Sequence, residues 1–448
     1  MDRLLLLMTT TTYRARAFLE AATRLSVPVV VGTDERQVLE AANPGGNLTL
    51  NFVEPERATH AIVEFARQYP IRAVVAADDD GVILAAMASQ ALGLSSNSVE
   101  AARAARNKFR MRKVVAEAGL PSPPFHHVFL EENPEHAARR VAYPCVLKPL
   151  FLAGSRGVIR ADSPAQFVAA FHRIAAILRR PEVAAQGGGL ARQILVEGYI
   201  PGDEVALEGL LVNGRLKVLA LFDKPDPLDG PFFEETIYVT PSRLPAAIQE
   251  RIAACTAQAV KALGLHDGPV HAELRLNEQG QWIIEIAPRS IGGLCSRTLR
   301  FGEGVSLEEL ILRHAMGREV ESLDREIRAA GVMMIPIPHA GILREVQGKE
   351  EAEELPGVEE IRLTIPAGQE LIPLPEGTRY LGFIFARGET PAHVEASLRE
   401  AHQRLKFIIA HPDELPEEAS DIAEGALTST SSGLAGGRRR IRAQASAN

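Results

Sequence analysis

The residues most able to do chemistry in this chain lie in one stretch, HAELRLNEQGQWIIEIAPR, at residues 271–289. Apolar and polar side chains alternate through this stretch, which predicts two antiparallel strands joined by a turn. The register of the two strands follows from placing the apolar residues on one face. That register gives three cross-strand pairs: Leu276 with Trp282, Leu274 with Ile284, and Glu273 with Glu285.

The third pair sets the carboxylates of Glu273 and Glu285 side by side. Carboxylates directly opposite each other in a sheet, with Cβ atoms ~5 Å apart, repel. A divalent cation turns this repulsion into binding, and Mg²⁺ completes its ligand shell with phosphate oxygens and water. The hairpin therefore suggests a metal–nucleotide site. The alternative is a half-exposed amphipathic hairpin whose two glutamates face solvent.

The composition is that of an ordinary soluble globular protein. Of the 448 residues, 46% are hydrophobic and 24% are charged, and this length predicts about two to four domains. The formal net charge is −8, which argues against a general nucleic-acid binder. No apolar run reaches the ~20 residues of a membrane span. The apolar run at residues 4–8 is expected to be a buried first strand rather than a signal peptide.

The cysteines bear on the cellular compartment. Cys145, Cys255 and Cys295 are far apart and odd in number. They offer neither a disulfide framework nor the spacing of zinc ligands. This usage fits a reducing environment, so a cytoplasmic location is expected.

Residues 1–96 alternate strand and helix, which predicts an open α/β domain. Strands are expected at 4–8, 27–31 and 73–77, and helices at 14–25, 59–68 and 82–92. No G-x-G-x-x-G follows the first strand and no P-loop motif occurs, so the usual dinucleotide and P-loop interpretations fail. The acidic run Asp78, Asp79 and Asp80 is most simply interpreted as capping the next helix.

The rest of the chain carries further helix, turn and composition signals. Residues 97–118 are expected to form one helix, because Asn97 and Glu100 have capping-box spacing. Asn213 and Gly214 form a strong type I′ hairpin signal. Residues 331–410 form a further strand-and-helix unit that ends in an amphipathic helix. The segment 412–448 becomes acidic, then Ser/Thr/Gly-rich, then basic, which predicts a disordered tail.

Polar landmarks along the chain together supply the parts of a nucleotide phosphotransfer site. Lysines suit phosphates, a flexible loop offers backbone N–H groups, acids hold Mg²⁺, and an arginine stabilises charge that develops in a transition state. Taken singly, each has a plainer explanation, such as a snorkelling lysine or an ordinary turn. The landmarks are Lys108, Lys148, the loop Gly154, Ser155, Arg156 and Gly157, then Glu197, Glu204, Glu273, Glu285 and Arg289.

Four stretches in this order resemble the ATP-grasp superfamily of carboxylate–amine ligases, which includes amino-acid ligases and biotin-carboxylase-like enzymes. They are NKFRMRKVVAEAGLPSP (107–123), YPCVLKPLFLAGSRGV (143–158), ILVEGYIPGDE (194–204) and HAELRLNEQGQWIIEIAPRSIGG (271–293). The resemblance implies a multidomain protein of mixed α/β and α+β class. Its expected parts are an N-terminal open α/β domain at 1–96, a two-lobed ATP-grasp domain at 97–320 and a small C-terminal α+β subdomain at 321–411.

The resemblance also implies roles for the matching residues. For ATP, it implies that Lys108 and Lys148 contact the phosphates, with Lys148 also near the adenine. A mobile loop made of Gly154, Ser155, Arg156 and Gly157 would close over the phosphates. Glu197 and Ile200 would contact the adenine, and Glu204 would contact the ribose. For the chemical step, it implies that Glu273 and Glu285 hold Mg²⁺ (or Mn²⁺), and that Arg289 stabilises the phosphoryl group and the acyl intermediate.

The implied reaction is ATP-dependent ligation. ATP converts a carboxylate to an acyl phosphate, and an amine attacks it to give an amide, ADP and phosphate. One departure matters: the family often has Asn two residues after its second metal-binding Glu, where this chain has Ala287. The number of Mg²⁺ ions, one or two, therefore stays open. Alternative functions are a carboxylase, a ligase that uses another nucleophile, and a non-catalytic nucleotide-binding regulatory protein, which Ala287 favours.

Substrate recognition is expected just past the hairpin. Arg297 and Arg300 share a face if their segment is helical, and arginine suits bidentate binding of a carboxylate. We expect at least one of them to orient the acid, opposite a loop where Glu235 would suit an ammonium group and Phe233 an apolar side chain. Alternatively, both arginines face solvent or pair with acids such as Glu303. The expected partners are small carboxylates and amines, without nucleic acid or membrane, and the chain is compatible with a homodimer.

Overall fold

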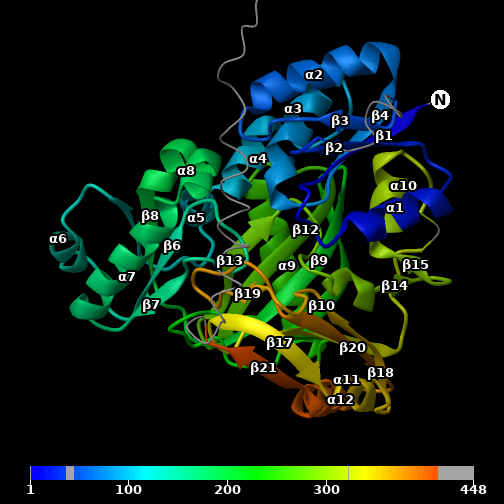
Figure 1. Cartoon of the computed structure of the whole chain (residues 1–448). Coiled ribbons are helices and arrows are strands. Elements are labelled where there is room, and N and C mark those ends of the chain that lie inside the picture. Colours follow the sequence, from blue (N-terminus) through cyan, green and yellow to red (C-terminus); the bar gives the residue numbers. More distant parts are fainter. Residues whose placement is uncertain (1, 37–44, 321, 412–448) are drawn as a thin grey trace, which may run out of the picture.

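The protein is described here by a computed structural model that covers residues 2–36, 45–320 and 322–411. The tail at 412–448, expected to be disordered, lies outside the described residues. Figure 1 shows a small lobe that projects from a large central sheet, with the N-terminal unit at one end of that sheet and the C-terminal unit at the other. Among the described residues, no helix combines the length and the apolar character needed to cross a lipid bilayer.

The N-terminal unit is a parallel sheet with helices on both faces, as the sequence predicted. Its strands lie in the order β3-β2-β1-β4. Leu4 and Leu6 of β1 pack toward Phe18 of α1, whereas Leu5 packs on the other face with Ile62 of α2. The bounds are β1 (Arg3–Leu7), α1 (Ala15–Arg24), β2 (Val29–Thr33), β3 (Asn47–Thr49), α2 (Pro55–Gln68), β4 (Ile71–Ala76) and α3 (Val82–Leu92).

The single helix expected at 97–118 is wrong, because the segment forms two helices that meet at Asn107. They are α4 (Val99–Arg106) and α5 (Lys108–Glu117). Ser98 caps α4 by accepting the backbone N–H of Ala101, so the expected capping by Asn97 is wrong too. Asn107 breaks the helical run because its own side chain caps α5. The break places Lys108 at the start of α5.

The small lobe is an antiparallel sheet in the order β5-β8-β6-β7, covered by one long helix. Phe167, Phe171 and Ile174 of α7 pack against the sheet, including Leu147 of β6 and Ile194 of β8. The bounds are β5 (Phe125–Phe129), α6 (Pro134–Ala138), β6 (Cys145–Pro149), β7 (Ile159–Ala161), α7 (Pro164–Leu178), α8 (Pro181–Gly187) and β8 (Gln193–Gly198).

The large sheet has the order β13-β12-β9-β10-β11-β16-β20-β18. One face of its first strands packs against α9, as when Leu207 and Leu274 meet Ile252. The hairpin predicted at Asn213 and Gly214 joins β9 to β10, and both residues have the positive φ that a type I′ turn requires. The bounds are β9 (Asp203–Val212), β10 (Arg215–Lys224), β11 (Ile237–Thr240), α9 (Ala246–Ala262), β12 (Gly268–Asn277) and β13 (Gly280–Ala287).

The C-terminal unit extends this sheet and adds a hydrophobic core of its own. β11 pairs with β16, and the helix α12 covers the added strands through Val394 and Leu398. A second sheet, β19-β17-β21, packs beside them. The bounds are β14 (Arg300–Phe301), β15 (Val305–Ser306), α10 (Leu307–Ala315), β16 (Ala329–Ile335), β17 (Gly341–Gln347), α11 (Lys349–Glu353), β18 (Val358–Leu363), β19 (Glu370–Leu371), β20 (Gly382–Gly388), α12 (Pro391–Arg404) and β21 (Lys406–Ala410).

The predicted register of the β12–β13 hairpin is right at its centre and wrong toward its turn. Glu273 lies opposite Glu285, as expected. The register then shifts by one residue, so that Leu274 faces Ile283 instead of Ile284, and Leu276 faces Gln281 instead of Trp282. Such a bulge leaves one extra residue on one strand and re-aims its side chain. The extra residue, Ile284, lines the main cavity.

Candidate active site

A cavity of about 750 Å³ lies where the small lobe, the large sheet and the N-terminal unit meet. The carboxyl ends of β1 and β4 open into it, which is where open parallel sheets usually place ligands. Most residues singled out from the sequence line this cavity. They are Lys108, Lys148, Gly154, Ser155, Arg156, Glu197, Ile200, Glu204, Phe233, Glu235, Glu273, Glu285 and Arg289.

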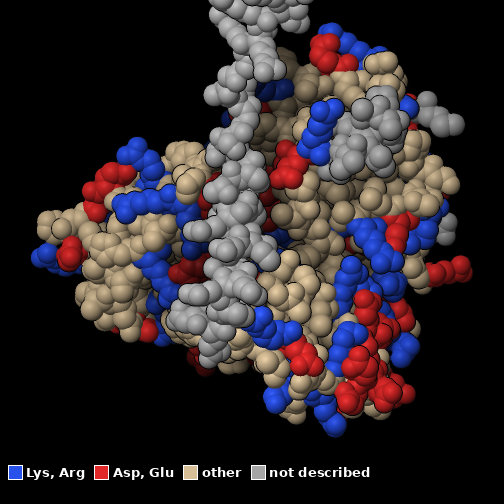
Figure 2. Space-filling view, viewed as in Figure 1, with Lys and Arg blue, Asp and Glu red and all other residues tan. Residues whose placement is uncertain are grey.

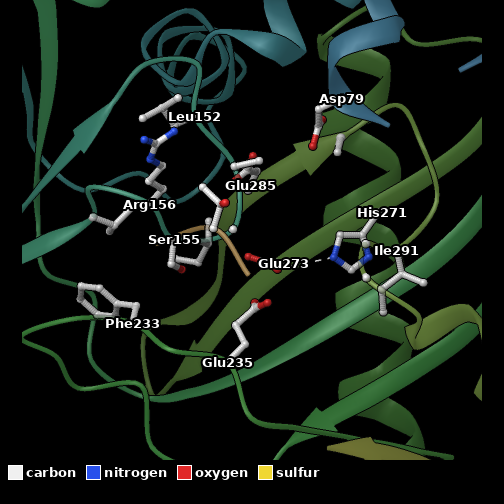
Figure 3. A pocket seen from close by; sticks show the side chains of 18 of the residues that line it. Asp79, Leu152, Ser155, Arg156, Phe233, Glu235, His271, Glu273, Glu285 and Ile291 are labelled. Carbon is white, nitrogen blue, oxygen red and sulfur yellow. Dashed lines mark hydrogen bonds and ion pairs between the residues drawn. The ribbon is translucent and has the colours of Figure 1, made fainter. Parts of the chain in front are cut away.

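The opposed pair Glu273 and Glu285 projects into this cavity (Figure 3). Lys108 Nζ lies 3.0 Å from Oε1 of Glu285 and also donates to the carbonyl oxygen of Leu152. His271 Nε2 lies 3.5 Å from Oε1 of Glu273. Two carboxylates that share one wall of a polar cavity suit a single hard divalent cation. Ala287 on the same wall offers no further ligand.

A buried ion triad sets the position of Lys148. Its Nζ lies 2.6 Å from Oε2 of Glu197, and Arg112 Nε donates to Oε1 of Glu197 at 2.6 Å. Burial alone would raise the pKa of Glu197, but Arg112 and Lys148 outweigh it and lower that pKa to about 2. Both oxygens of Glu197 are therefore engaged, and the ionised carboxylate holds Lys148 at the cavity wall.

Glu197→Gln should destabilise the protein at neutral pH by about 3 kcal/mol, because two buried cations lose their counter-charge. The unfolded-state pKa of 4.5 lies above the folded-state value of about 2. The stabilisation from Glu197 is thus present above pH 4.5 and is lost as the pH falls through this window. Denaturant unfolding between pH 7 and ~3 should show the difference between wild type and variant shrinking toward low pH. Glu117→Gln on the exposed face of α5 is the control, and a pH-independent difference would contradict the assignment.

Arg289 is held by a residue whose role the sequence did not reveal. Its Nε and Nη2 donate to Oδ2 of Asp79 at 3.0 and 2.9 Å, and Arg106 Nη1 lies 3.0 Å from Oδ1 of Asp79. Burial opposes ionisation of Asp79, but Arg289 and Arg106 lower its pKa below the usual range. The expectation that the acidic run caps α3 is wrong, because no side chain caps that helix. Asp79 instead orients Arg289 toward the cavity (Figure 3 shows Asp79).

The Gly-rich loop covers one side of the cavity. Gly154, Ser155 and Gly157 all have positive φ, which a side-chain-bearing residue such as Ser155 rarely adopts. Ser155 and Arg156 line the cavity (Figure 3). Gly157 is not one of the described residues that line the cavity. Its backbone N–H donates to the carbonyl oxygen of Pro375 at 2.9 Å. This bond ties the base of the loop to the C-terminal unit.

Glu204, expected to contact the ribose, and Glu235, expected to bind a substrate ammonium group, both accept hydrogen bonds from Lys224, a residue that sequence reasoning missed. Lys224 Nζ lies 2.7 Å from Glu204 Oε1 and 2.6 Å from Glu235 Oε1. Arg275 Nε donates to the other oxygen of Glu204 at 3.0 Å. Burial, together with the neighbouring Glu273, raises the pKa of Glu235. The ammonium that Glu235 meets in this structure is therefore that of Lys224.

The expectation that Arg297 or Arg300 faces the main cavity is wrong. Their segment forms only a 3₁₀ turn at Cys295–Thr298 and the short strand β14, so the two side chains do not share a helical face. Arg297 pairs with Glu360 and lies over the ring of Phe385. Arg300 donates to backbone carbonyls. Both line a separate cavity of about 480 Å³ between α1 and β18, a region where basic and acidic side chains lie together (Figure 2).

Comparison with known proteins gives a consistent assignment. A family model described as ATP-grasp domain matches residues 141–298, one described as ATP-grasp N-terminal domain matches 19–95, and one described as L-amino acid ligase C-terminal domain 2 matches 333–410. The chain is 27% identical to an alanine–anticapsin ligase from Bacillus amyloliquefaciens over 57% of this chain and 56% of that protein. It is 30% identical to dapdiamide A synthase from Enterobacter agglomerans over 50% of this chain and 52% of that protein.

Both alignments span only about half the length of these relatives. A crystal structure of an L-amino acid ligase from Bacillus licheniformis matches almost the whole chain. The TM-score is 0.76 at 26% identity, over 92% of this chain and 99% of that one. The three domain matches follow the order of the units described above. The chain thus contains an ATP-grasp domain, preceded by an ATP-grasp N-terminal domain, and has the overall fold of the L-amino acid ligase from Bacillus licheniformis.

Proposed function

We propose that this protein is an ATP-dependent ligase that joins a carboxylate, such as that of an amino acid, to an amine. The observation that carries the proposal is the convergence of Glu273, Glu285, Lys108, Lys148 and Arg289 on one cavity. Opposed acids, buried lysines and a partly buried arginine are what phosphoryl transfer needs, because its catalysis is mainly positioning and charge neutralisation.

Lys108 and Lys148 would bind the triphosphate of ATP. Lys108 and Lys148 are each 8% exposed, and both extend toward the cavity. Glu285 pairs with Lys108 and Glu197 pairs with Lys148, so these carboxylates orient the two ammonium groups. Each ammonium group keeps an N–H donor that its glutamate does not use. The adenine would lie near Ile200 and the bulged residue Ile284, two apolar side chains of the same cavity.

Glu273 and Glu285 would hold Mg²⁺. The donor set fits this ion, because the two carboxylates are cross-strand neighbours and Mg²⁺ typically takes one or two carboxylates plus phosphate oxygens. When bound, the ion would neutralise charge on the transferred phosphoryl group. The protein would supply alignment and no covalent link.

Arg289 would stabilise the negative charge that forms at the reacting centre. Its bonds to Asp79 and to the carbonyl oxygen of Ser290 leave further N–H groups of the guanidinium unused. In the first step a carboxylate oxygen of the acid would attack the γ-phosphorus and expel ADP. In the second step the amine nitrogen would attack the acyl carbon, expel phosphate and release a proton.

The loop of Gly154, Ser155, Arg156 and Gly157 would close over the phosphates. A non-hydrolysable ATP analogue with Mg²⁺ should slow backbone hydrogen exchange in this loop by roughly tenfold or more. The physical reason is that phosphate contacts offset the entropy lost when a flexible loop becomes ordered. The turn at Asn213 and Gly214, which is exposed and not part of the cavity wall, is the internal control. Equal exchange with and without the analogue would argue for a plain structural turn.

ADP release measured against a panel of acids and amines tests the function itself. A ligase requires ATP, an acid and an amine together. ADP release with bicarbonate in place of an organic acid would indicate a carboxylase instead. Tight nucleotide binding without ADP release under any combination would favour the non-catalytic alternative that Ala287 suggests.

A further inference from the structure

A loop of the C-terminal unit reaches the small lobe beside the Gly-rich loop. This segment, residues 375–380 between β19 and β20, is called the strap below. Its first residue, Pro375, accepts the hydrogen bond from Gly157 at the base of the Gly-rich loop. Its second residue, Glu376, pairs with Arg173 on α7 of the small lobe. The strap therefore contacts the small lobe through two consecutive residues.

The pair of Glu376 and Arg173 is bidentate. Arg173 Nε donates to Oε1 of Glu376 at 2.6 Å, and Arg173 Nη2 donates to Oε2 at 2.9 Å. The same guanidinium lies over the ring of Phe232, 4.9 Å from its centre. Two parallel hydrogen bonds fix the direction of approach as well as the distance. The pair thus specifies where α7 lies relative to the C-terminal unit.

The exposure of this pair argues against a mainly stabilising role. The side chain of Arg173 is 45% exposed and that of Glu376 is 23% exposed. Ion pairs that are open to water contribute little to the free energy of unfolding. A lobe that moves between open and closed positions nevertheless responds to a few-fold bias, because its two positions are close in free energy.

The strap holds the base of the Gly-rich loop and leaves its tip free. A Cβ atom added at Gly157 would lie 2.7 Å from Pro149 Cγ, so the base is closely packed. A Cβ atom added at Gly154 would meet no atom of the described residues within 4 Å. Burial lowers the pKa of Arg156 in the same loop, and the charge of Glu376 is among those that oppose this. The tip can therefore close over a ligand while the base stays in place.

The other end of the strap is anchored in the C-terminal unit. Arg379 Nη2 donates to the carbonyl oxygen of Thr364 at 2.7 Å, and Thr364 Oγ1 donates to that of Tyr380 at 2.7 Å. Arg379 and Tyr380 line the main cavity. Between the two ends, a Cβ atom added at Gly377 would lie 1.8 Å from the carbonyl oxygen of Ile372. The strap is therefore a closely packed connection from the cavity wall to the small lobe.

We propose that the strap holds the small lobe over the nucleotide, with Glu376 as a positioning residue that acts through Arg173. The inference rests on the proposed function, because it places the nucleotide under the Gly-rich loop. Glu376 is not one of the described residues that line the cavity, so it takes no part in bond making. With the base of the loop held, only its tip becomes ordered when ATP binds, and less conformational entropy is lost. The strap thus favours nucleotide binding.

Backbone hydrogen exchange in the Gly-rich loop, measured without nucleotide, tests the proposal without relying on turnover. Arg173→Gln and Glu376→Gln should each speed this exchange by about fivefold, the upper range for an ion pair open to water. The double variant should match either single variant, because both substitutions remove the same contact. Exchange in the buried strand β9 should stay unchanged, which separates release of the lobe from general destabilisation. The dissociation constant of a non-hydrolysable ATP analogue with Mg²⁺, measured by calorimetry, should rise by about fivefold in each variant.

Glu131→Gln is the matched control, because Glu131 pairs with Arg192 at exposed positions within the small lobe. It should leave the exchange of the Gly-rich loop unchanged, and an equal acceleration in this control would overturn the proposal. Wild-type exchange in both single variants would also overturn it. So would an acceleration of about 25-fold in the double variant, because additive effects would mean that the two residues act separately.

Failure of the proposed function gives a different result. If the analogue does not bind to the wild type, the nucleotide site on which the inference rests is wrong. The exchange measured without nucleotide still decides whether the strap holds the small lobe. The two failures are thus distinguishable.

Discussion

Glu285→Gln is expected to lower the kcat of Mg²⁺-dependent ATP turnover by about 10²–10³-fold while the fold stays intact. The substitution removes one of the two opposed charges and keeps the size of the side chain. A divalent cation would then be held by Glu273 alone, and Lys108 would lose the partner that lies 3.0 Å away. The rate of ADP release, measured over a range of Mg²⁺ concentrations, should fall at every concentration.

The matched control for this variant is Glu278→Gln, on the exposed turn of the same hairpin. It makes the same chemical change outside the cavity and should turn over at the wild-type rate. If Glu285→Gln turned over at close to the wild-type rate, Glu273 and Glu285 would not be the metal ligands. An equal loss in Glu278→Gln would show that the hairpin is sensitive to any change of charge.

Arg289→Lys is expected to lower kcat/KM by about 100-fold, close to the effect of losing one well-placed donor to a developing negative charge. Lysine retains the charge, so Asp79 keeps a cationic partner and the fold should survive. It loses the planar fork that donates to Asp79 and reaches the cavity at the same time. Steady-state kinetics should place most of the loss in kcat, because the proposed contact strengthens in the transition state.

Arg300→Lys makes the same substitution in the second cavity and should leave both kinetic constants within about twofold of wild type. This variant also tests whether Arg300 contacts the substrate. A large rise in KM for the acid in Arg300→Lys would restore its role in substrate binding. Wild-type kinetics in Arg289→Lys would contradict the role of Arg289 at the reacting centre.

The central feature of the site was predictable from local rules. Alternation of apolar and polar residues placed Glu273 opposite Glu285, and the structure has this pair. The pairs nearer the turn were wrong, because a β-bulge at Ile284 shifts the register by one residue. A bulge is set by packing and by contacts on both strands, such as the bond from Arg112 to the carbonyl oxygen of Ile283. Alternation in one strand carries no signal of it.

The residues that sequence reasoning missed act through long-range contacts. Asp79 and Arg289 are far apart in the chain and meet only because the end of β4 opens toward the hairpin. Lys224 ends a strand before a loop rich in Pro and Gly, and nothing local predicts three carboxylates around it. The error on Arg297 and Arg300 had another cause. It assumed a helix where the chain makes a 3₁₀ turn and a short strand.

The parallel first sheet, its helices at 14–25, 59–68 and 82–92, and the Asn213–Gly214 turn followed from strong periodic or turn signals. The boundary between α4 and α5 did not, because Asn107 can either continue a helix or cap the next one. Only the packed structure decides between these two conformations. That choice determines where Lys108 begins its helix and hence which part of the cavity it reaches.

The most direct test of the account follows the carboxylate oxygens of an acid that supports ADP release. The acid is labelled with ¹⁸O in its carboxylate, and the phosphate released during amide formation is analysed by mass spectrometry. An acyl-phosphate route transfers one carboxylate oxygen to phosphorus, so each inorganic phosphate released should carry one ¹⁸O atom. Phosphate free of ¹⁸O would contradict the account, and so would ¹⁸O appearing in AMP, which an acyl-adenylate route would produce.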